Sequence, residues 1–219
     1  MTLGMRLFRW GLANVVLAGI SFLCAGSVKL PSVAMYLVAF AVTDLVSTLV
    51  VNPDLAKERS RPLEGIDPVV RPLASLLFVV TVALGALDVG RIHWPLAFPR
   101  AVEVAALVVF VASNALQMWA MDVNAFFSTE LRIQEEFGHR LLRNGPYRCI
   151  RHPGYLAMIL IVPSTAFALG SRLALIPAAI YAALILFRVD REDRYLLRNL
   201  PGYADYIDRA HYRLIPGVW

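Results

Sequence analysis

The run from Asn144 to Tyr155, Asn-Gly-Pro-Tyr-Arg-Cys-Ile-Arg-His-Pro-Gly-Tyr, is the densest group of chemically capable side chains in this chain. Proline suits the first position of a helix, because its missing N–H would be unbonded there. We therefore expect a helix to begin at Pro153, with His152 near its cap. The free N–H groups of a helix start attract anions, and Arg148 and Arg151 add positive charge beside them. The run is suited to bind a carboxylate or phosphate, although an ordinary basic helix boundary would show the same residues.

A second polar group follows about one helical hairpin later and consists of Arg188, Glu192 and Asp193. Arg188 and Glu192 are four residues apart, so they share one face of a helix, with Asp193 next to it. A helix that returned antiparallel to the one starting at Pro153 would bring these charges close to His152. Taken alone, the group also fits a solvated, charged helix extension.

Apolar segments of membrane-spanning length must position both groups. Hydrophobic residues make up 58% of the 219-residue chain, against about 45–50% in soluble domains. Segments of this kind cover residues 7–27, 32–51, 72–90, 99–121, 154–170 and 172–189. The sequence therefore predicts an all-α, polytopic transmembrane helical bundle of about six spans. The last two are short and share the turn Gly170–Ser171, which predicts a tight helical hairpin.

The distribution of basic residues predicts that both termini are cytoplasmic. With that orientation, 17 of the 21 lysines and arginines lie on the cytoplasmic side. We expect an integral membrane protein, in a bacterial inner membrane, whose first span is retained rather than cleaved as a signal peptide. The net charge of +5 is then a topology signal and an attraction to membrane lipids, and it indicates no nucleic-acid partner.

The cytoplasmic segments predict short interfacial helices. Asp54 is suited to cap one in the first such loop, and residues 122–152 show the irregular amphipathic pattern of another. The tail carries Tyr203, Tyr206 and Tyr212, which we expect at the depth of the lipid headgroups. The chain thus divides into residues 1–121, with four spans, and a functional region at residues 122–219.

Other polar residues within the spans have two interpretations each. Asp44 is an intramembrane acid, which favours a functional role, but a hydrogen bond to Asn14 or Asn114 would also explain it. Asp88 and Glu103 are expected at the outer interface. Neither cysteine has metal-ligand spacing, and we predict no metal site.

The residues 145–155, followed by Arg188-x-x-x-Glu192-Asp193, resemble the isoprenylcysteine carboxyl methyltransferases, whose superfamily includes phospholipid N-methyltransferases. The segments 128–139, 200–203 and 212–219 extend the likeness, which covers residues 122–219. The family pattern usually has Glu-Glu where this chain has Glu192-Asp193, so the resemblance says less about Asp193.

The resemblance implies a methyltransferase that uses S-adenosylmethionine, bound between the cytoplasmic ends of the last two spans and the C-terminal segment. Its lipophilic acceptor, such as a prenylated cysteine, enters from the bilayer. The implied catalytic residues are Arg151, Arg188 and Glu192. The implied cofactor-binding residues are Gln134, His139, Gly145, Pro146, Tyr147, Arg148, His152, Pro153, Tyr155, Glu192 and Asp193.

The chemistry of this cofactor matches those residue types. Glu192 is suited to its amine or ribose hydroxyls, the arginines and the helix start to its carboxylate, and a tyrosine to its sulfonium or adenine. A carboxylate acceptor needs no general base, whereas an amine acceptor needs one, such as His152 or Glu192. Three alternatives stay open: a phospholipid N-methyltransferase, an NADPH-dependent membrane reductase, and a non-enzymatic transporter or assembly factor that uses Asp44.

Overall fold

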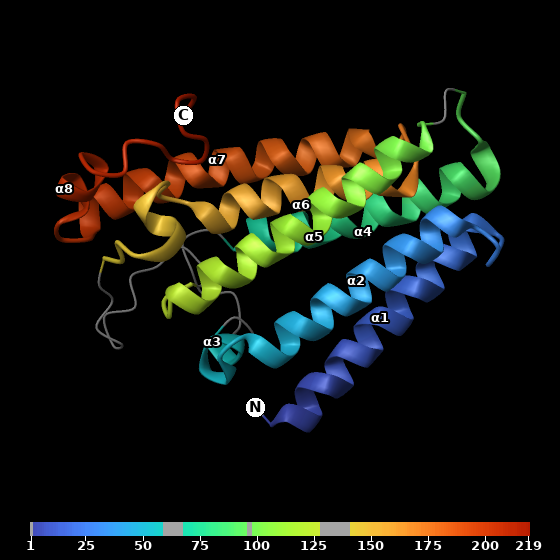
Figure 1. The fold of residues 1–219 in the computed structure, drawn as a ribbon, viewed down its shortest axis with the longest axis horizontal. Coiled ribbons are helices and arrows are strands. Elements are labelled where there is room, and N and C mark those ends of the chain that lie inside the picture. The colour runs from blue at the N-terminus through green and yellow to red at the C-terminus, as the bar shows by residue number, and fades with distance from the viewer. Residues whose placement is uncertain (1, 59–67, 96–97, 128–140) are drawn as a thin grey trace.

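The computed structural model describes residues 2–58, 68–95, 98–127 and 141–219, and these residues form helices and no strand. Figure 1 shows them in order along the chain. The elements are α1 (Leu3–Ala25), α2 (Pro31–Val50), α3 (Pro53–Glu58), α4 (Val70–Leu87), the π-helix η1 (Asp88–Ile92), α5 (Arg100–Val123), the 3-10 helix η3 (Gly145–Arg148), α6 (Pro153–Leu169), α7 (Leu175–Asn199) and α8 (Tyr203–Ile207). The predicted all-α helical bundle is confirmed.

The predicted spans correspond to six long helices in the described part of the chain. Four stretches are long and apolar enough to cross a membrane: α1, α2, α4 with η1, and α5. Helix α6 is apolar but has only 17 residues, about 25 Å at the usual rise per residue. Helix α7 has 25 residues and is apolar up to Phe187, after which it continues as a charged extension that begins at Arg188.

Prolines and glycines set the helix boundaries as the sequence predicts. Pro31 and Pro153 occupy the first turns of α2 and α6. Gly170 ends α6 with a φ of 82°, a left-handed conformation that glycine adopts without strain. The turn that follows leads into α7 and forms the predicted hairpin. At α3 the cap differs from the expectation: Asn52, not Asp54, supplies the side-chain oxygen, which accepts from the Asp54 N–H at 2.8 Å.

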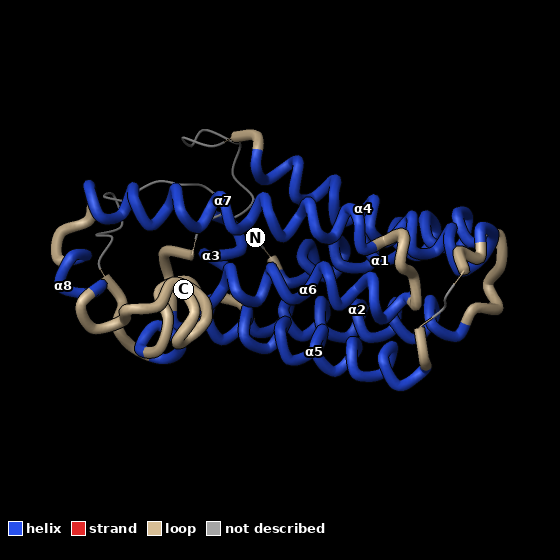
Figure 2. Tube along the Cα trace, turned by 90° about the horizontal axis from the view of Figure 1, so that it is seen from above, coloured by secondary structure: helices blue, strands red, loops and turns tan. Residues whose placement is uncertain are grey.

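The long helices run along a common direction, as Figure 2 shows from above. Helix α6 packs against α5, α7 and α4, while α1 and α2 form a hairpin that contacts α4 and α5. One end of the bundle carries both termini: α1, α4 and α6 begin there, and α2, α5 and α7 end there (Figure 1). We call it the terminal end. It corresponds to the end that the basic residues predict to be cytoplasmic.

Aromatic and small side chains fill the core where the two groups of helices meet. Tyr36 of α2 and Phe110 of α5 are almost fully buried, and their rings contact edge to face with centroids 5.4 Å apart. The hydroxyl of Thr165 in α6 donates to the Tyr36 oxygen at 3.3 Å. These contacts hold α2, α5 and α6 together.

The far end of the bundle is fixed around the π-helix. Asp88 is 3% exposed and accepts from the Ser171 hydroxyl at 2.5 Å and from the Trp94 N–H at 2.9 Å. Asp88 thus lies at the end of its span, as expected, but it is buried there, and its carboxylate joins α4 to the hairpin turn. Gly90 lies against the backbone of Ala25, so closely that an added Cβ would sit 2.2 Å from the Ala25 carbonyl oxygen.

Candidate functional site

The start of α6 has the local structure that its sequence predicts. Gly145 has a φ of 55° and opens the 3-10 helix, and a Cβ there would lie 2.7 Å from the Val123 side chain. Pro146 and Tyr147 are buried in this turn. The chain then reaches Pro153, the first residue of α6, with His152 at the N-cap position.

Asp193 is the centre of the hydrogen-bond network at the terminal end. Its side chain is 5% exposed and accepts from five donors: Arg151 Nε at 2.9 Å and Nη2 at 3.1 Å, His152 Nε2 at 3.0 Å, the Tyr203 hydroxyl at 2.7 Å, and Arg213 Nε at 2.9 Å. One carboxylate on α7 thus connects the start of α6 to α8 and to the C-terminal segment.

Backbone and guanidinium contacts extend this connection. The N–H groups of Arg151 and His152 donate to the carbonyl oxygens of Tyr212 and Arg213 at 3.0 and 2.9 Å. Nη1 of Arg151 donates to the carbonyls of Ala210 and His211, both at 2.8 Å. The C-terminal segment is therefore fixed against the mouth of the α6–α7 hairpin.

The network keeps Asp193 ionised. Burial alone would raise the pKa of its carboxyl, but the hydrogen bonds from His152, Arg151 and Tyr203 outweigh that and hold the pKa well below its ordinary value. Burial and the neighbouring Asp193 charge raise the pKa of Tyr203 above its usual range, and burial raises that of Tyr206 to about 12. Both tyrosines therefore remain neutral hydrogen-bond donors at physiological pH.

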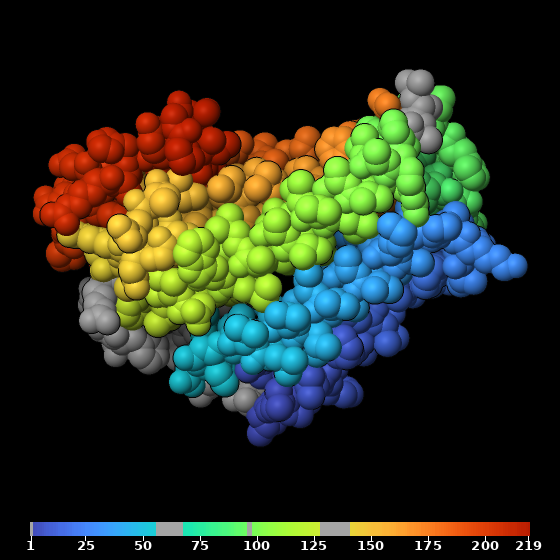
Figure 3. All heavy atoms as spheres, in the orientation of Figure 1, coloured from blue at the N-terminus to red at the C-terminus, as the bar shows by residue number. Residues whose placement is uncertain are grey.

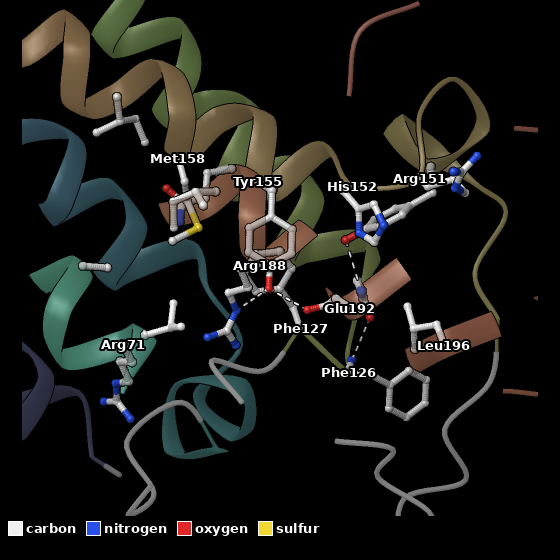
Figure 4. A pocket seen from close by; sticks show the side chains of 18 of the residues that line it. Arg71, Phe126, Phe127, Arg151, His152, Tyr155, Met158, Arg188, Glu192 and Leu196 are labelled. Atoms are coloured by element: carbon white, nitrogen blue, oxygen red, sulfur yellow. Dashed lines mark hydrogen bonds between the residues drawn. The ribbon is translucent and has the colours of Figure 1, made fainter. Parts of the chain in front are cut away.

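Glu192, Tyr155 and Arg188 form a second, separate chain of hydrogen bonds on the other face of α7. Nε of Arg188 donates to the Tyr155 hydroxyl at 2.7 Å, and that hydroxyl donates to Oε2 of Glu192 at 2.6 Å. Figure 4 shows both bonds meeting at the Tyr155 oxygen. Arg188 is buried, with 4% exposure. These hydrogen bonds therefore link a buried cation to a carboxylate nearer the mouth.

Residues of both hydrogen-bond networks line one cavity of about 650 Å³. This size is typical of small-molecule sites. Its polar end is lined by Tyr147, Arg151, His152, Glu192, Tyr203 and Tyr206. Its other end lies among α4, α6 and α7 and is mainly apolar, with Ala74, Phe78, Met158, Ile161, Val162 and Ile185. Tyr155 and Arg188 also line it, so the cavity joins an aqueous mouth to the apolar part of the bundle.

Two phenylalanines that closely follow α5, Phe126 and Phe127, lie near the start of α6. Phe127 lies on Gly154, where an added Cβ would be 2.3 Å from the ring. The Phe126 N–H donates to Asn124 Oδ1 at 2.9 Å, and the Asn124 amide donates to the Tyr147 hydroxyl at 3.1 Å. These contacts place two aromatic rings at the polar end, as Figure 4 shows for the labelled Phe126 and Phe127.

The structure brings together some of the predicted site residues and separates others. Six of the predicted residues line the cavity: Tyr147, Arg151, His152, Tyr155, Arg188 and Glu192. Five do not line it: Gly145, Pro146, Arg148, Pro153 and Asp193. Two, Gln134 and His139, lie outside the described residues, as does most of the predicted interfacial helix.

Several lining residues were not predicted from the sequence. Tyr203 and Tyr206, which were expected at the depth of the lipid headgroups, are 2% and 3% exposed and line the cavity, so their side chains face the protein interior. Their spacing, three residues apart on a short helix, is the signal that could have indicated a shared inward face. Arg71 of α4 lies across the cavity from His152 in Figure 4, and nothing near it in the sequence indicates this.

The intramembrane acid Asp44 lies away from this cavity. Its Oδ2 accepts from the Asn14 amide at 3.2 Å, which is one of the two contacts expected, while the Asn114 amide donates to the Phe110 carbonyl instead. Among the described residues, no group of histidine, cysteine or acidic side chains has the arrangement of a metal site.

Comparison with known proteins gives the family of this region. Residues 105–198 match the sequence model of the isoprenylcysteine carboxyl methyltransferase (ICMT) family. No curated protein matches the chain. The matched residues run from α5 through the motif at the start of α6 to the end of the charged extension of α7. They contain the chain of Tyr155, Arg188 and Glu192, whereas Tyr203 and Arg213 of the Asp193 network lie beyond them. The region that carries the site is therefore similar to the isoprenylcysteine carboxyl methyltransferase family, and this similarity supports a membrane methyltransferase.

Proposed function

We propose that this protein is an S-adenosylmethionine-dependent methyltransferase that acts on a lipophilic acceptor, with the carboxylate of a prenylated cysteine or a similar lipid as the favoured acceptor. The observation that carries the proposal is the single cavity with two chemically different ends. Tyrosines and a carboxylate surround the mouth, and apolar side chains of α4, α6 and α7 surround the inner part. A polar cofactor and a lipid therefore have adjoining places.

The residues at the polar end fit this cofactor. When bound, S-adenosylmethionine supplies an electrophilic methyl group on a sulfonium centre. Glu192 offers a carboxylate to its amine or ribose hydroxyls, and the rings of Tyr147, Phe126 and Tyr206 suit its cation and its adenine. Gly154, in the first turn of α6, lines the cavity, so the free N–H groups of that turn suit its carboxylate.

The structure supports a different role for Arg151 from the one that the resemblance implies. Nearly all of its N–H donors are taken by Asp193 and by the carbonyls of Ala210 and His211. Arg151 and Asp193 are thus positioning residues, which fix the C-terminal segment as one wall of the site. His152 shares this function through its hydrogen bond to Asp193.

Arg188 is the residue best placed to orient an acceptor anion. It is buried and borders the apolar part of the cavity, and its hydrogen bond to Tyr155 fixes the direction of its guanidinium. A carboxylate acceptor is already an anion, so the protein needs only to align it and to exclude water. The buried cation Arg188 in the cavity wall thus favours an anionic acceptor and with it O-methylation.

Calorimetric binding to the detergent-purified protein tests the cofactor. S-adenosylhomocysteine should bind, and Glu192→Gln should weaken its binding about 10-fold or more, because a charge-assisted hydrogen bond is lost. Asp208→Asn, an exposed carboxylate outside the cavity, should bind it as the unaltered protein does. Absence of S-adenosylhomocysteine binding would overturn the proposal, and binding of NADPH in its place would favour the reductase. Equal affinity in the Glu192→Gln protein would refute only the role of Glu192.

A transfer assay tests the acceptor. Protein in lipid vesicles, supplied with methyl-labelled S-adenosylmethionine and a farnesyl-cysteine derivative, should give a labelled product that alkali hydrolyses, as expected of an ester. Alkali-stable label on phosphatidylethanolamine would instead show N-methylation of a phospholipid.

A further inference from the structure

A second cavity, of about 470 Å³, lies at the terminal end between the α1–α2 hairpin and helices α4 and α5. In Figure 1, α1 and α2 meet the other helices at the far end of the bundle and diverge from α5 toward the N-terminus. Figure 3 shows a furrow between the surfaces of α5 and α2. The cavity shares only Arg71 and Gln117 with the first one among their described lining residues.

Three arginines from two helices surround this cavity. Arg6 is 7% exposed, and its Nη2 donates to the carbonyl oxygen of Val51 at 2.8 Å, which fixes it at the end of α2. Arg9 lies one turn further along α1 and makes no hydrogen bond or ion pair within the described part of the chain. Arg71 approaches from α4. Guanidinium groups in such an arrangement favour a phosphate or a carboxylate.

The wall also carries polar groups at a depth where apolar side chains are expected. Asp44 lies seven residues before Val51 on α2, about two helical turns deeper than the cavity mouth. One of its oxygens accepts from Asn14, and the other accepts no hydrogen bond within the described residues. The Gln117 amide likewise has no hydrogen-bond partner there. Polar groups inside a span are costly, so a ligand with a hydroxyl or N–H group would satisfy them.

Apolar side chains complete the wall and suit the chain of an amphiphile. Trp10 and Phe40 line the cavity from α1 and α2, and Met118 and Met121 line it from α5. Asp44 is the one acidic side chain among the described lining residues, against three arginines, so these lining residues together carry a positive formal charge. The cavity thus has cations at its mouth, hydrogen-bonding groups deeper and apolar side chains beside them. This arrangement matches an amphiphile with an anionic headgroup.

We propose that the second cavity binds the headgroup of an anionic amphiphile, with a phosphate or carboxylate against Arg9 and Arg71 and a neighbouring hydroxyl or N–H group donating to Asp44. The site is separate from the methyl-transfer cavity and does not depend on the function proposed for it. Because Arg71 and Gln117 face both cavities, the bound headgroup lies directly beside the proposed acceptor site.

Binding measurements on the purified full chain test this proposal with lauroyl lysophosphatidic acid, which has a terminal phosphate and a free hydroxyl. Arg9→Gln should weaken its binding about 10-fold, since one charge-assisted contact is lost. Arg198→Gln is the matched control, because Arg198 is an exposed arginine at the same end and lines neither cavity. It should leave the affinity unchanged, and S-adenosylhomocysteine should bind both variants equally.

Four results would overturn the proposal, and a fifth would refute the role that it gives to Asp44. Absence of lysophosphatidic acid binding is the first, and equal weakening by Arg9→Gln and Arg198→Gln, which indicates only bulk charge, is the second. Equal binding of lauroyl lysophosphatidylcholine, whose phosphate is capped, would refute anion recognition. Displacement of the lipid by an equal concentration of inorganic phosphate would identify a soluble anion as the ligand. Tighter lipid binding by Asp44→Asn would refute the role of Asp44, since the proposal expects weaker binding.

Discussion

At the scale of single residues, the neighbours Glu192 and Asp193 have different surroundings and therefore different functions. Asp193 accepts hydrogen bonds from Arg151, His152, Tyr203 and Arg213 and lies outside the cavity lining. Glu192 lines the cavity and accepts from Tyr155 alone among the described side chains. The acid whose carboxylate remains accessible is the one suited to a cofactor, and the saturated acid is suited to holding the structure.

The hydroxyl of Tyr155 should matter for activity more than for folding. Tyr155→Phe removes the oxygen that joins Arg188 to Glu192, so both charged groups lose a fixed direction. We expect kcat/KM to fall about 10- to 100-fold, the cost of a hydrogen bond to a charged group, with little change in the thermal unfolding temperature. Tyr181→Phe is the matched control, because Tyr181 lines the same cavity and its hydroxyl makes no hydrogen bond in the described part of the chain. An equal loss of activity in both variants would contradict this role.

At the scale of elements, the C-terminal segment is held in place by side chains more than by its own helix. Helix α8 has only five residues, yet Tyr203 and Tyr206 are buried, and the Tyr206 hydroxyl donates to the Tyr147 carbonyl at 2.6 Å. A short helix has little stability of its own. The wall that it provides therefore depends on the network around Asp193.

Asp193→Asn should release this segment. Loss of one partner of a buried ionic network costs about 3–5 kcal/mol, so we expect a lower unfolding temperature and faster proteolysis after Asn199, with α1 to α6 still protected. Asp208→Asn, on an exposed carboxylate, should change neither.

The lowered pKa of Asp193 also predicts how the stability lost in the Asp193→Asn protein depends on pH. A lowered carboxyl pKa contributes stability that is fully present above the unfolded value, about 3.9, and is lost as the pH falls through the folded value. The stability difference between the unaltered protein and Asp193→Asn should thus be constant from neutral pH down to about pH 5 and should shrink below about pH 4. Thermal unfolding at several pH values measures it. A difference that disappears already near pH 6 would show that a group other than Asp193 controls it.

At the scale of the whole molecule, the site is assembled from helices of the matched family region together with α4 and α8. The matched family region supplies most of the polar end, but α4 contributes Arg71 and much of the apolar end. The α1–α2 hairpin contacts α4 and α5 and forms one side of the second cavity. Its close approach to the π-helix at Gly90 keeps this hairpin in place.

Gly90→Ala should separate that hairpin from the rest of the bundle. The added Cβ would lie 2.2 Å from the backbone oxygen of Ala25, which cannot move without moving α1. We expect a destabilisation of at least about 1–3 kcal/mol and weaker lysophosphatidic acid binding. Gly19→Ala in α1 is the control, since nothing lies within 4 Å of its added Cβ, and it should be neutral or slightly stabilising. Equal stability of the two variants would show that the contact at Gly90 is not required.

The sequence by itself determined the fold class, the helix start at Pro153, the hairpin turn at Gly170 and the shared face of Arg188 and Glu192. Each of these follows from local rules: apolar length, the missing N–H of proline, the left-handed freedom of glycine and the helical repeat. The family motif added the residues around Tyr155 to the prediction.

Only the tertiary structure decided which of these residues share a cavity. Contacts between Asp193 and Tyr203, between Tyr155 and Glu192, or between Asp88 and Ser171 join positions 10 to 83 residues apart. No local pattern specifies such pairs, because they depend on how whole helices pack. For the same reason Arg71 and Tyr206 were not predicted as lining residues, and the bonds from the Arg151 guanidinium to the carbonyls of Ala210 and His211 were not predicted either.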